Sequence, residues 1–239
     1  MARITSVIIG IQARSTSTRL PDKALRMMAG RPMIEWVVDA CTKSARYLST
    51  RTHSLEKIVV DVKLLVPAGD GIAGEINSVP ILEGSHDDVL SRYVDMAKEY
   101  NPDYIVRVTG DCPLIPDHVI THMIKTAVAN TYDYLSNVDE DCRTDLDGLD
   151  CEVMSKKALN WLDQKGLTDE EKEHVTLHLR KNAPPWARMG FSIGNFDFSS
   201  LKKSVDTEED FQAVEREILK LKELKKRAEA KYGKNIHRH

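Results

Sequence analysis

Three cationic side chains directly follow the first apolar segment of the chain, and their spacing suits the binding of phosphate. Residues 7–11 form a β-branched apolar run of strand length, and the polar loop after it contains Arg14, Arg19 and Lys23. Backbone N–H groups of such a loop can surround phosphate oxygens while guanidinium and ammonium groups neutralise their charge. Neither G-x-x-x-x-G-K-[ST] nor G-x-G-x-x-G occurs here, so this is neither of the familiar phosphate loops. On these residues alone, a surface loop that binds nothing is the alternative.

Two aspartates supply the ligand type that a divalent cation prefers. Asp111 follows the apolar segment 104–108 and precedes Pro113, so its carboxylate should point over the edge of a sheet. Asp206 stands before a helical segment far along the chain. Mg²⁺ accepts one or two carboxylates together with water and phosphate oxygens. The alternative roles are the capping of a turn by Asp111 and of a helix by Asp206.

The elements that must position these residues alternate between strand and helix. Apolar spacing predicts helices over 32–45 and 87–100, and β-rich composition predicts strands over 57–66 and 104–108. This alternation indicates a mostly parallel sheet covered on both faces. Ligands of such sheets bind beyond the carboxyl ends of the strands, which is where the cationic loop should lie.

The remaining segments are predicted as loops and a final helix. Polar composition with weak patterning predicts loops over 47–56 and 68–78. Residues 207–231 are predicted as a long solvated helix, with a coiled-coil partner as the alternative. Its expected docking stripe consists of Phe211, Val214, Ile218 and Leu221.

Length and composition predict one enzyme domain over residues 1–239. The chain is 41% hydrophobic, enough for a sizeable core, and its net charge of −3 is evenly interleaved. It therefore has no basic surface for nucleic acid and no polybasic membrane patch. The absence of a secretory signal and of a run of about 20 apolar residues predicts a cytoplasmic protein. Cys41, Cys112, Cys142 and Cys151 form no C-x-x-C pair and are expected to be free thiols.

The cationic loop resembles the opening signature of the cytidylyltransferases that activate acidic sugars, in particular the spore-coat polysaccharide (SpsF) branch. The signature reads A-R-x-x-S-x-R-L-P-x-K, and its matches here are Ala13, Arg14, Ser17, Arg19, Leu20, Pro21 and Lys23. In that family the loop holds the nucleotide triphosphate. The resemblance therefore implies that Ala13, Arg14, Ser17, Arg19 and Lys23 bind nucleotide.

Further segments extend the resemblance from Ile8 to about Phe211. A strand-end G-D before Pro and a later V-D-T-x-E-D hold magnesium in the family, which implies Asp111 and Asp206 as Mg²⁺ ligands. A two-metal site is an alternative. Residues 83–93 are similar to G-S-x-D-D-V-L-x-R-Y, which lies near the nucleotide. This match implies base or ribose contacts from Ser85 and Asp88, although a helix start explains them equally well.

Three more matches resemble segments that approach the acceptor substrate. They are Y-L-S-N at 134–137, D-G-L-D-C-E at 147–152 and E-H-V-T at 173–176. The acceptor-binding residues that they imply are Asn137, Asp147, Asp150, Glu152 and His174. Roles in turns, strand edges or packing are the alternatives for these residues.

The resemblance implies a three-layer α/β/α nucleotidyltransferase fold, Rossmann-like and GT-A-like, with a mostly parallel mixed sheet. It implies Mg²⁺-dependent transfer of CMP from CTP to an acidic sugar or related acceptor, with release of pyrophosphate, for surface polysaccharide or glycan biosynthesis. Lys23, Arg14 and Asp111 are the implied catalytic residues. A homodimer is the implied assembly. A metal-dependent glycosyltransferase that uses a nucleotide-sugar and a non-catalytic nucleotide-binding protein are the alternatives.

The chain departs from the family pattern near the expected ligand edge. Ser15 and Thr16 stand where the family often has a small residue or Gly, and Asp22 replaces a frequent Gly before the lysine. Extra polar residues occur at 47–56, and L-V-P-A-G-D at 65–70 replaces the usual Ala-Thr-Ser after the second strand. These departures leave the base and the acceptor open.

Overall fold

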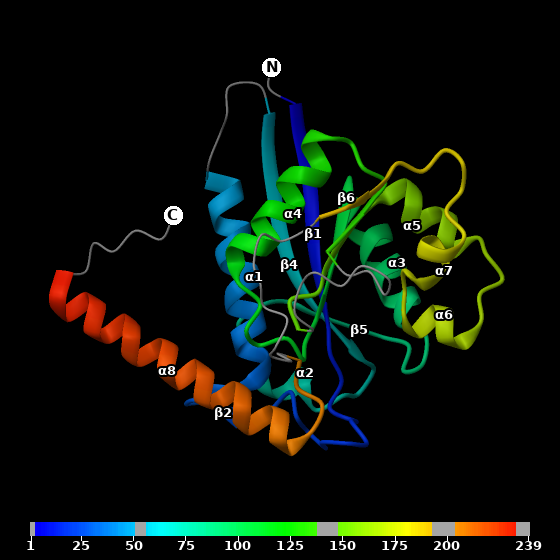
Figure 1. Cartoon of the computed structure of the whole chain (residues 1–239). Helices are drawn as coiled ribbons and strands as arrows, with labels where there is room; N and C mark the ends of the chain where they lie inside the picture. The colour runs from blue at the N-terminus through cyan, green and yellow to red at the C-terminus, as the bar shows by residue number, and fades with distance from the viewer. Residues whose placement is uncertain (1–2, 51–55, 138–147, 193–203, 233–239) are drawn as a thin grey trace.

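The computed structural model describes residues 3–50, 56–137, 148–192 and 204–232 of the chain. Within these ranges, helices cover both faces of a central sheet, which confirms the expected α/β/α layers (Figure 1). The sheet has seven strands in the order β5-β4-β1-β6-β8-β7-β9. They are β1 (Arg3–Gln12), β4 (Glu56–Pro67), β5 (Ile81–Gly84), β6 (Tyr104–Thr109), β7 (Tyr134–Ser136), β8 (Cys151–Ser155) and β9 (Met189–Phe191). A separate two-stranded ribbon consists of β2 (Met27–Met28) and β3 (Arg31–Pro32).

The sheet is mixed but mostly parallel, as expected. β1 pairs in parallel with β4 and β6, and β4 pairs in parallel with β5. β8 runs antiparallel to both β6 and β7, whereas β7 pairs in parallel with β9. The carboxyl ends of β1, β4 and β6 therefore meet at one edge, where the loops that follow them lie close together.

The helices cover the sheet through two apolar cores. They are α1 (Met33–Thr50), α2 (Ile72–Glu75), α3 (Val89–Tyr100), α4 (Asp117–Ala129), α5 (Lys156–Asp163), α6 (Asp169–Glu173), α7 (Leu177–Lys181) and α8 (Glu208–Tyr232). α1 and α4 pack on the face that carries Ile9 and Ile11, and α3, α5 and α7 pack on the face that carries Ile8. Because successive strand residues point to opposite faces, the continuous apolar run of β1 supplies both cores.

Some element boundaries differ from the sequence prediction. α1 continues to Thr50, so the loop predicted over 47–56 was wrong for residues 47–50. Leu48 is buried, and this apolar contact carries the helix beyond residue 45. The loop predicted over 68–78 contains the short helix α2. α3 begins at Val89 rather than at 87, because the Asp88 carboxylate caps it by accepting from Ser91 N.

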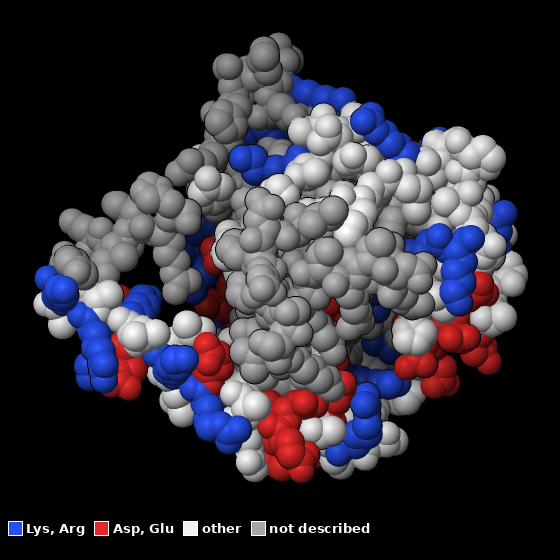
Figure 2. Space-filling model, viewed as in Figure 1, with Lys and Arg blue, Asp and Glu red and all other residues white. Residues whose placement is uncertain are grey.

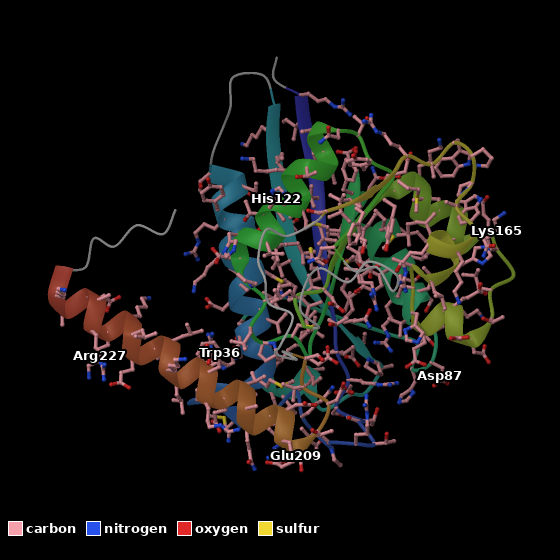
Figure 3. The ribbon with its side chains drawn as sticks, viewed as in Figure 1. Trp36, Asp87, His122, Lys165, Glu209 and Arg227 are labelled. Carbon is pink, nitrogen blue, oxygen red and sulfur yellow. The ribbon has the colours of Figure 1, made fainter. Side chains whose placement is uncertain are left out.

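α8 docks on the ribbon and α1 by the first part of its apolar stripe. Phe211, Val214 and Ile218 are buried in a third apolar cluster, but Leu221 is 47% exposed. Trp36 of α1 lies beside α8, with the Lys222 ammonium 4.8 Å from its ring centroid (Figure 3). The stripe prediction therefore holds for three of its four residues.

Acidic side chains gather where α6 and α8 begin (Figure 2). The first turn of α6 contains Asp169, Glu170 and Glu171, and its N-cap Thr168 forms a reciprocal capping box with Glu171. Negative charge stabilises a helix N-terminus because the first backbone N–H groups carry partial positive charge. These caps fix α6, whose last residue faces the cleft described below.

Three cysteines lie among the described residues, and all three are buried free thiols, as predicted. Burial raises the pKa of Cys41 and of Cys151, so both thiols remain protonated. Cys142 lies outside the described residues. No helix in the described part of the chain has the length and apolar character needed to cross a membrane.

A buried ion pair joins β6 to β8 through the paired residues Arg107 and Glu152. Hydroxyls of Tyr134 and Thr176 also donate to the Glu152 carboxylate, and Arg107 Nε donates to Gln12 Oε1 at 2.9 Å. Burial raises the pKa of Glu152, but the Arg107 charge and the hydroxyl donors outweigh burial, so this pKa lies below its ordinary 4.5. Glu152 is therefore ionised in the folded protein at neutral pH.

Replacing Glu152 with Gln should leave the Arg107 charge buried without its partner, and we expect the free energy of unfolding at neutral pH to fall by about 3–5 kcal/mol. The pKa of Glu152 in the folded protein lies below the ordinary 4.5. The contribution of the ionised carboxylate to the free energy of unfolding is therefore complete above pH 4.5, and it declines as the pH falls through the folded pKa. Urea unfolding across this pH range measures the difference. The control is Asp95→Asn, which removes an exposed carboxylate from α3. Equal stability of wild type and Glu152→Gln at neutral pH would contradict the prediction.

Candidate active site

A cleft of about 680 Å³ opens where the ends of β1 and β6 meet the segment before α8. Its walls also include residues near the start of α3 and near the end of α6. The ionisable side chains that line it are Arg14, Arg19, Lys23, His86, Arg92, Arg107, Asp111, Cys112, Asp150, Glu173, His174 and Asp206. The cleft therefore lies at the sheet edge where the sequence predicted ligand binding.

Backbone hydrogen bonds bring three distant segments together in this cleft. Gly110 N donates to Gln12 O at 2.8 Å, which ties the end of β6 to the end of β1. A Cβ on Gly110 would stand 3.0 Å from Gln12 O, so the absence of a side chain permits this approach. Val205 N donates to Asp111 O at 2.9 Å, which brings the segment before α8 against the end of β6.

The side chains of Lys23, Asp111 and Asp206 form one ion cluster. Lys23 Nζ lies 3.1 Å from Asp111 Oδ2, 3.5 Å from Asp206 Oδ1 and 2.6 Å from the carbonyl oxygen of Val205. The Lys23 side chain is 13% exposed, whereas Arg19, which also pairs with Asp206 at 2.9 Å, is 66% exposed. The sequence predicted that these four residues act at one site, and the structure places them together.

The ion cluster suits a divalent cation. The carboxylates of Asp111 and Asp206 converge on a position that already accommodates the positive charge of Lys23, with a carbonyl oxygen beside it. These are hard oxygen donors of the kind that Mg²⁺ prefers. No group of three or more metal-ligating side chains occurs among the described residues, so phosphate oxygens and water would have to complete the coordination.

Three further residues of the loop signature line the cleft, whereas Leu20 packs in the apolar cluster beneath α8. Ala13, Arg14 and Ser17 are on its wall, and Ala13 N donates to Leu65 O of β4 at 3.0 Å. Arg14 reaches across the cleft to Glu173 at the end of α6, with its Nη2 atom 3.1 Å from the Glu173 carboxylate. Both partners of this pair are about half exposed, so water and salt screen it strongly.

Ser85 and Asp88 do not line the cleft. The Asp88 carboxylate caps α3, and the Ser85 hydroxyl accepts from Asp88 N at 3.1 Å. Both side chains therefore act at the start of α3, which was the alternative to nucleotide contacts. Their neighbours His86 and Arg92 line the cleft instead, and the nucleotide contacts of Ser85 and Asp88 stay a prediction.

The predicted acceptor residues divide between the cleft and the core. Asp150 and His174 line the cleft. Asn137 is buried, where it accepts from Cys151 N and donates to Leu149 O, both at 2.8 Å. Glu152 is buried in its ion pair with β6, and Asp147 lies outside the described residues. Two of the four residues that the structure describes are therefore in a position to touch an acceptor in this cleft.

Sequence reasoning missed several cleft residues. Arg92 is buried and donates to the backbone oxygens of Ser85 and His86, at 2.7 and 3.0 Å. It lay within a recognised motif but received no role. In the sequence, Arg107 is the single charged residue of the apolar segment 104–108. A charge in such a segment indicates that a partner of opposite charge is buried beside it. Glu173 carried no signal beyond its place next to His174.

Comparisons with known proteins show a family and a fold. The sequence model of a family described as Cytidylyltransferase matches residues 7–233. The spore coat polysaccharide biosynthesis protein SpsF of Bacillus subtilis is 26% identical over 223 residues, covering 88% of this chain and 85% of that protein. Among solved structures, a cytidylyltransferase from Leptospira borgpetersenii has a TM-score of 0.75 at 23% identity, over 100% of both chains.

A second solved structure, CMP:2-keto-3-deoxy-manno-octonic acid synthetase complexed with CTP, has a TM-score of 0.62 at 15% identity. The match covers 92% of this chain and 100% of that one. At such identities, the two structures show a shared fold. Because the family match spans nearly the whole chain, including the cationic loop and both aspartates, this protein belongs to the cytidylyltransferase family.

Proposed function

We propose that this protein transfers CMP from CTP to an acidic sugar, or a related acceptor, in a Mg²⁺-dependent reaction for surface polysaccharide or glycan biosynthesis. The observation that carries the proposal is the convergence of Lys23, Asp111 and Asp206 in a cleft whose wall includes Arg14 and Arg19. The similarity to SpsF and to a synthetase that was solved with CTP supports the nucleotide and the acceptor class.

The proposed reaction is an in-line displacement at the α-phosphorus of CTP. An acceptor oxygen forms a bond to this phosphorus while the bond to the bridging oxygen of the β-phosphate breaks. The acceptor hydroxyl loses its proton to solvent, and pyrophosphate leaves with the electron pair of the broken bond. Positioning and charge neutralisation carry most of the catalysis in such a reaction, so no covalent nucleophile is needed.

Each cleft residue has a role that its chemistry supports. Arg14, Arg19 and Lys23 would neutralise the β- and γ-phosphates as they depart. Asp111 and Asp206 would hold Mg²⁺, which stabilises charge on the phosphate oxygens and favours ionisation of the acceptor hydroxyl. Asp150 and His174, on the same cleft, are the proposed acceptor contacts.

Replacing Asp111 with Asn should lower kcat/KM for CTP about a hundredfold, the usual cost of removing one charge-stabilising contact from a transition state. Steady-state kinetics and a thermal melt measure activity and folding together. Asp95→Asn, on the exposed face of α3, is the matched control and should retain wild-type activity. A folded Asp111→Asn enzyme with unchanged turnover would remove this residue from the metal site.

Replacing Lys23 with Ala should also lower kcat/KM about a hundredfold. It removes the ammonium that Asp111 and Asp206 share, while Arg19 still pairs with Asp206, so added Mg²⁺ should raise the melting temperature of this variant more than that of wild type. Differential scanning calorimetry with and without Mg²⁺ measures both shifts, and Lys43→Ala on α1 is the control. Equal shifts in the variant and the wild type would argue against a cation site between the two aspartates.

A pyrophosphate-release screen tests the reaction itself. We expect release only when CTP, Mg²⁺ and an acidic sugar are present together, and the product should be a CMP-sugar. The other three nucleoside triphosphates serve as controls. Nucleoside diphosphate released from a nucleotide-sugar would identify a glycosyltransferase instead, and nucleotide binding without product under all acceptors would identify a non-catalytic protein.

A further inference from the structure

A buried carboxylate stands behind the cationic loop. Asp70, at the end of the segment that follows β4, is 9% exposed and does not line the cleft. Its Oδ2 atom accepts from Ser15 N at 2.8 Å and from Ser15 Oγ at 3.0 Å, and its Oδ1 atom accepts from Ile72 N at 3.0 Å. Three donors therefore compensate for the burial of this charge.

Ser15 also forms hydrogen bonds within the loop. Its carbonyl oxygen accepts from Ser17 N at 2.8 Å and from Asp22 N at 3.0 Å. Asp22 has a φ of 54°, in the left-handed region that glycine and, less often, aspartate adopt. The single residue Ser15 thus closes the loop on itself and ties it to the end of β4.

This contact unites departures from the family pattern that looked separate in the sequence. Ser15 and Asp22 depart from the family pattern, and Asp70 ends the segment 65–70 that replaces the usual Ala-Thr-Ser. Hydrogen bonds join Ser15 to each of the other two residues. Residues on either side of Ser15 point to the cleft: Arg14, Ser17 and Arg19 all line it. A displacement of Ser15 would therefore move the cations that face the ligand.

A carboxylate behind a phosphate-binding loop also has an electrostatic cost, because it repels the ligand that the loop binds. Backbone and hydroxyl donors of the loop and of α2 take up the lone pairs of Asp70, and the nearby Arg92 charge also offsets its charge. Holding a loop in its binding conformation before the ligand arrives strengthens binding, because less ordering entropy is lost.

We propose that Asp70 is a positioning residue that holds the loop through Ser15 and thereby sets the affinity for the nucleoside triphosphate. This proposal rests on the proposed function, because it takes the loop to be the triphosphate site. Asp70 touches no ligand, so it acts on the binding of CTP and leaves the chemical step and the acceptor unchanged.

The test compares Asp70→Asn with wild type in steady-state kinetics and in calorimetric titration with CTP. The amide keeps one acceptor oxygen but replaces the other by a donor, so we expect KM and Kd for CTP to rise about tenfold, the effect of losing one strong hydrogen bond to the loop. The kcat and the KM of the acceptor should stay within about threefold of wild type. Hydrogen exchange of residues 13–23 without nucleotide should become faster.

Two further variants separate positioning from general stability. Glu83→Gln is the matched control, because the Glu83 carboxylate accepts from Gly69 N at 2.6 Å, beside Asp70, but has no hydrogen bond to the loop. It should leave the KM for CTP unchanged. Ser15→Ala removes only the hydroxyl donor, so a smaller rise of about threefold is expected, with little added effect in the Asp70→Asn background. Ser15→Ala also carries the test if Asp70→Asn fails to fold.

The outcomes distinguish this inference from the proposed function. An unchanged KM for CTP in both loop variants, a loss confined to kcat, or an equal effect of Glu83→Gln would each overturn the role of Asp70 while the enzyme remained a cytidylyltransferase. A wild-type protein that neither binds CTP nor releases pyrophosphate would overturn the proposed function, and the role of Asp70 with it.

Discussion

The cleft depends on one electrostatic interaction, the contact of the Lys23 ammonium with the carboxylates of Asp111 and Asp206. The three residues come from the loop after β1, the end of β6 and the segment before α8. At 13% exposure for the lysine side chain, this cluster is screened less by salt than the exposed pairs on the surface. Both carboxylates lie within 3.5 Å of the same ammonium, whose positive charge offsets the repulsion between them.

The sheet beneath the cleft brings two of these three segments together, and the backbone hydrogen bond from Val205 to Asp111 adds the third. β1 and β6 are parallel neighbours, so the loops after them leave from the same edge. The Arg107–Glu152 pair lies below, where β8 joins the parallel strands in the antiparallel direction. Arg107 also lines the cleft, so the buried network that stabilises the sheet forms part of the floor of the site.

The loop and the sheet edge are adapted to each other. The loop binds backbone of β4 through Ala13 N, and it binds the segment after β4 through Asp70. Its cations Arg14, Arg19 and Lys23 face the cleft, where acids of the cleft wall pair with them, while Asp70 lies behind the loop. The positive charges of the loop are therefore balanced largely within the cleft, in a protein whose net charge is −3.

Local pattern in the sequence was sufficient for the layers of the fold, most helices and strands and the place of the cationic loop, because apolar periodicity and residue type reflect local physics. The metal role of Asp111 and Asp206 came from the family resemblance, since capping explained these residues equally well on local pattern alone. Local pattern was not sufficient for the contacts between segments, because these contacts depend on strand register. Glu152 reads as a strand-edge acid, yet its pairing opposite Arg107 buries it. Asn137 likewise became a bridge between backbone groups, and Ser15 met Asp70 across 55 residues of chain. The tertiary structure alone decided these roles, because burial and partner are set by strand pairing rather than by neighbouring residues.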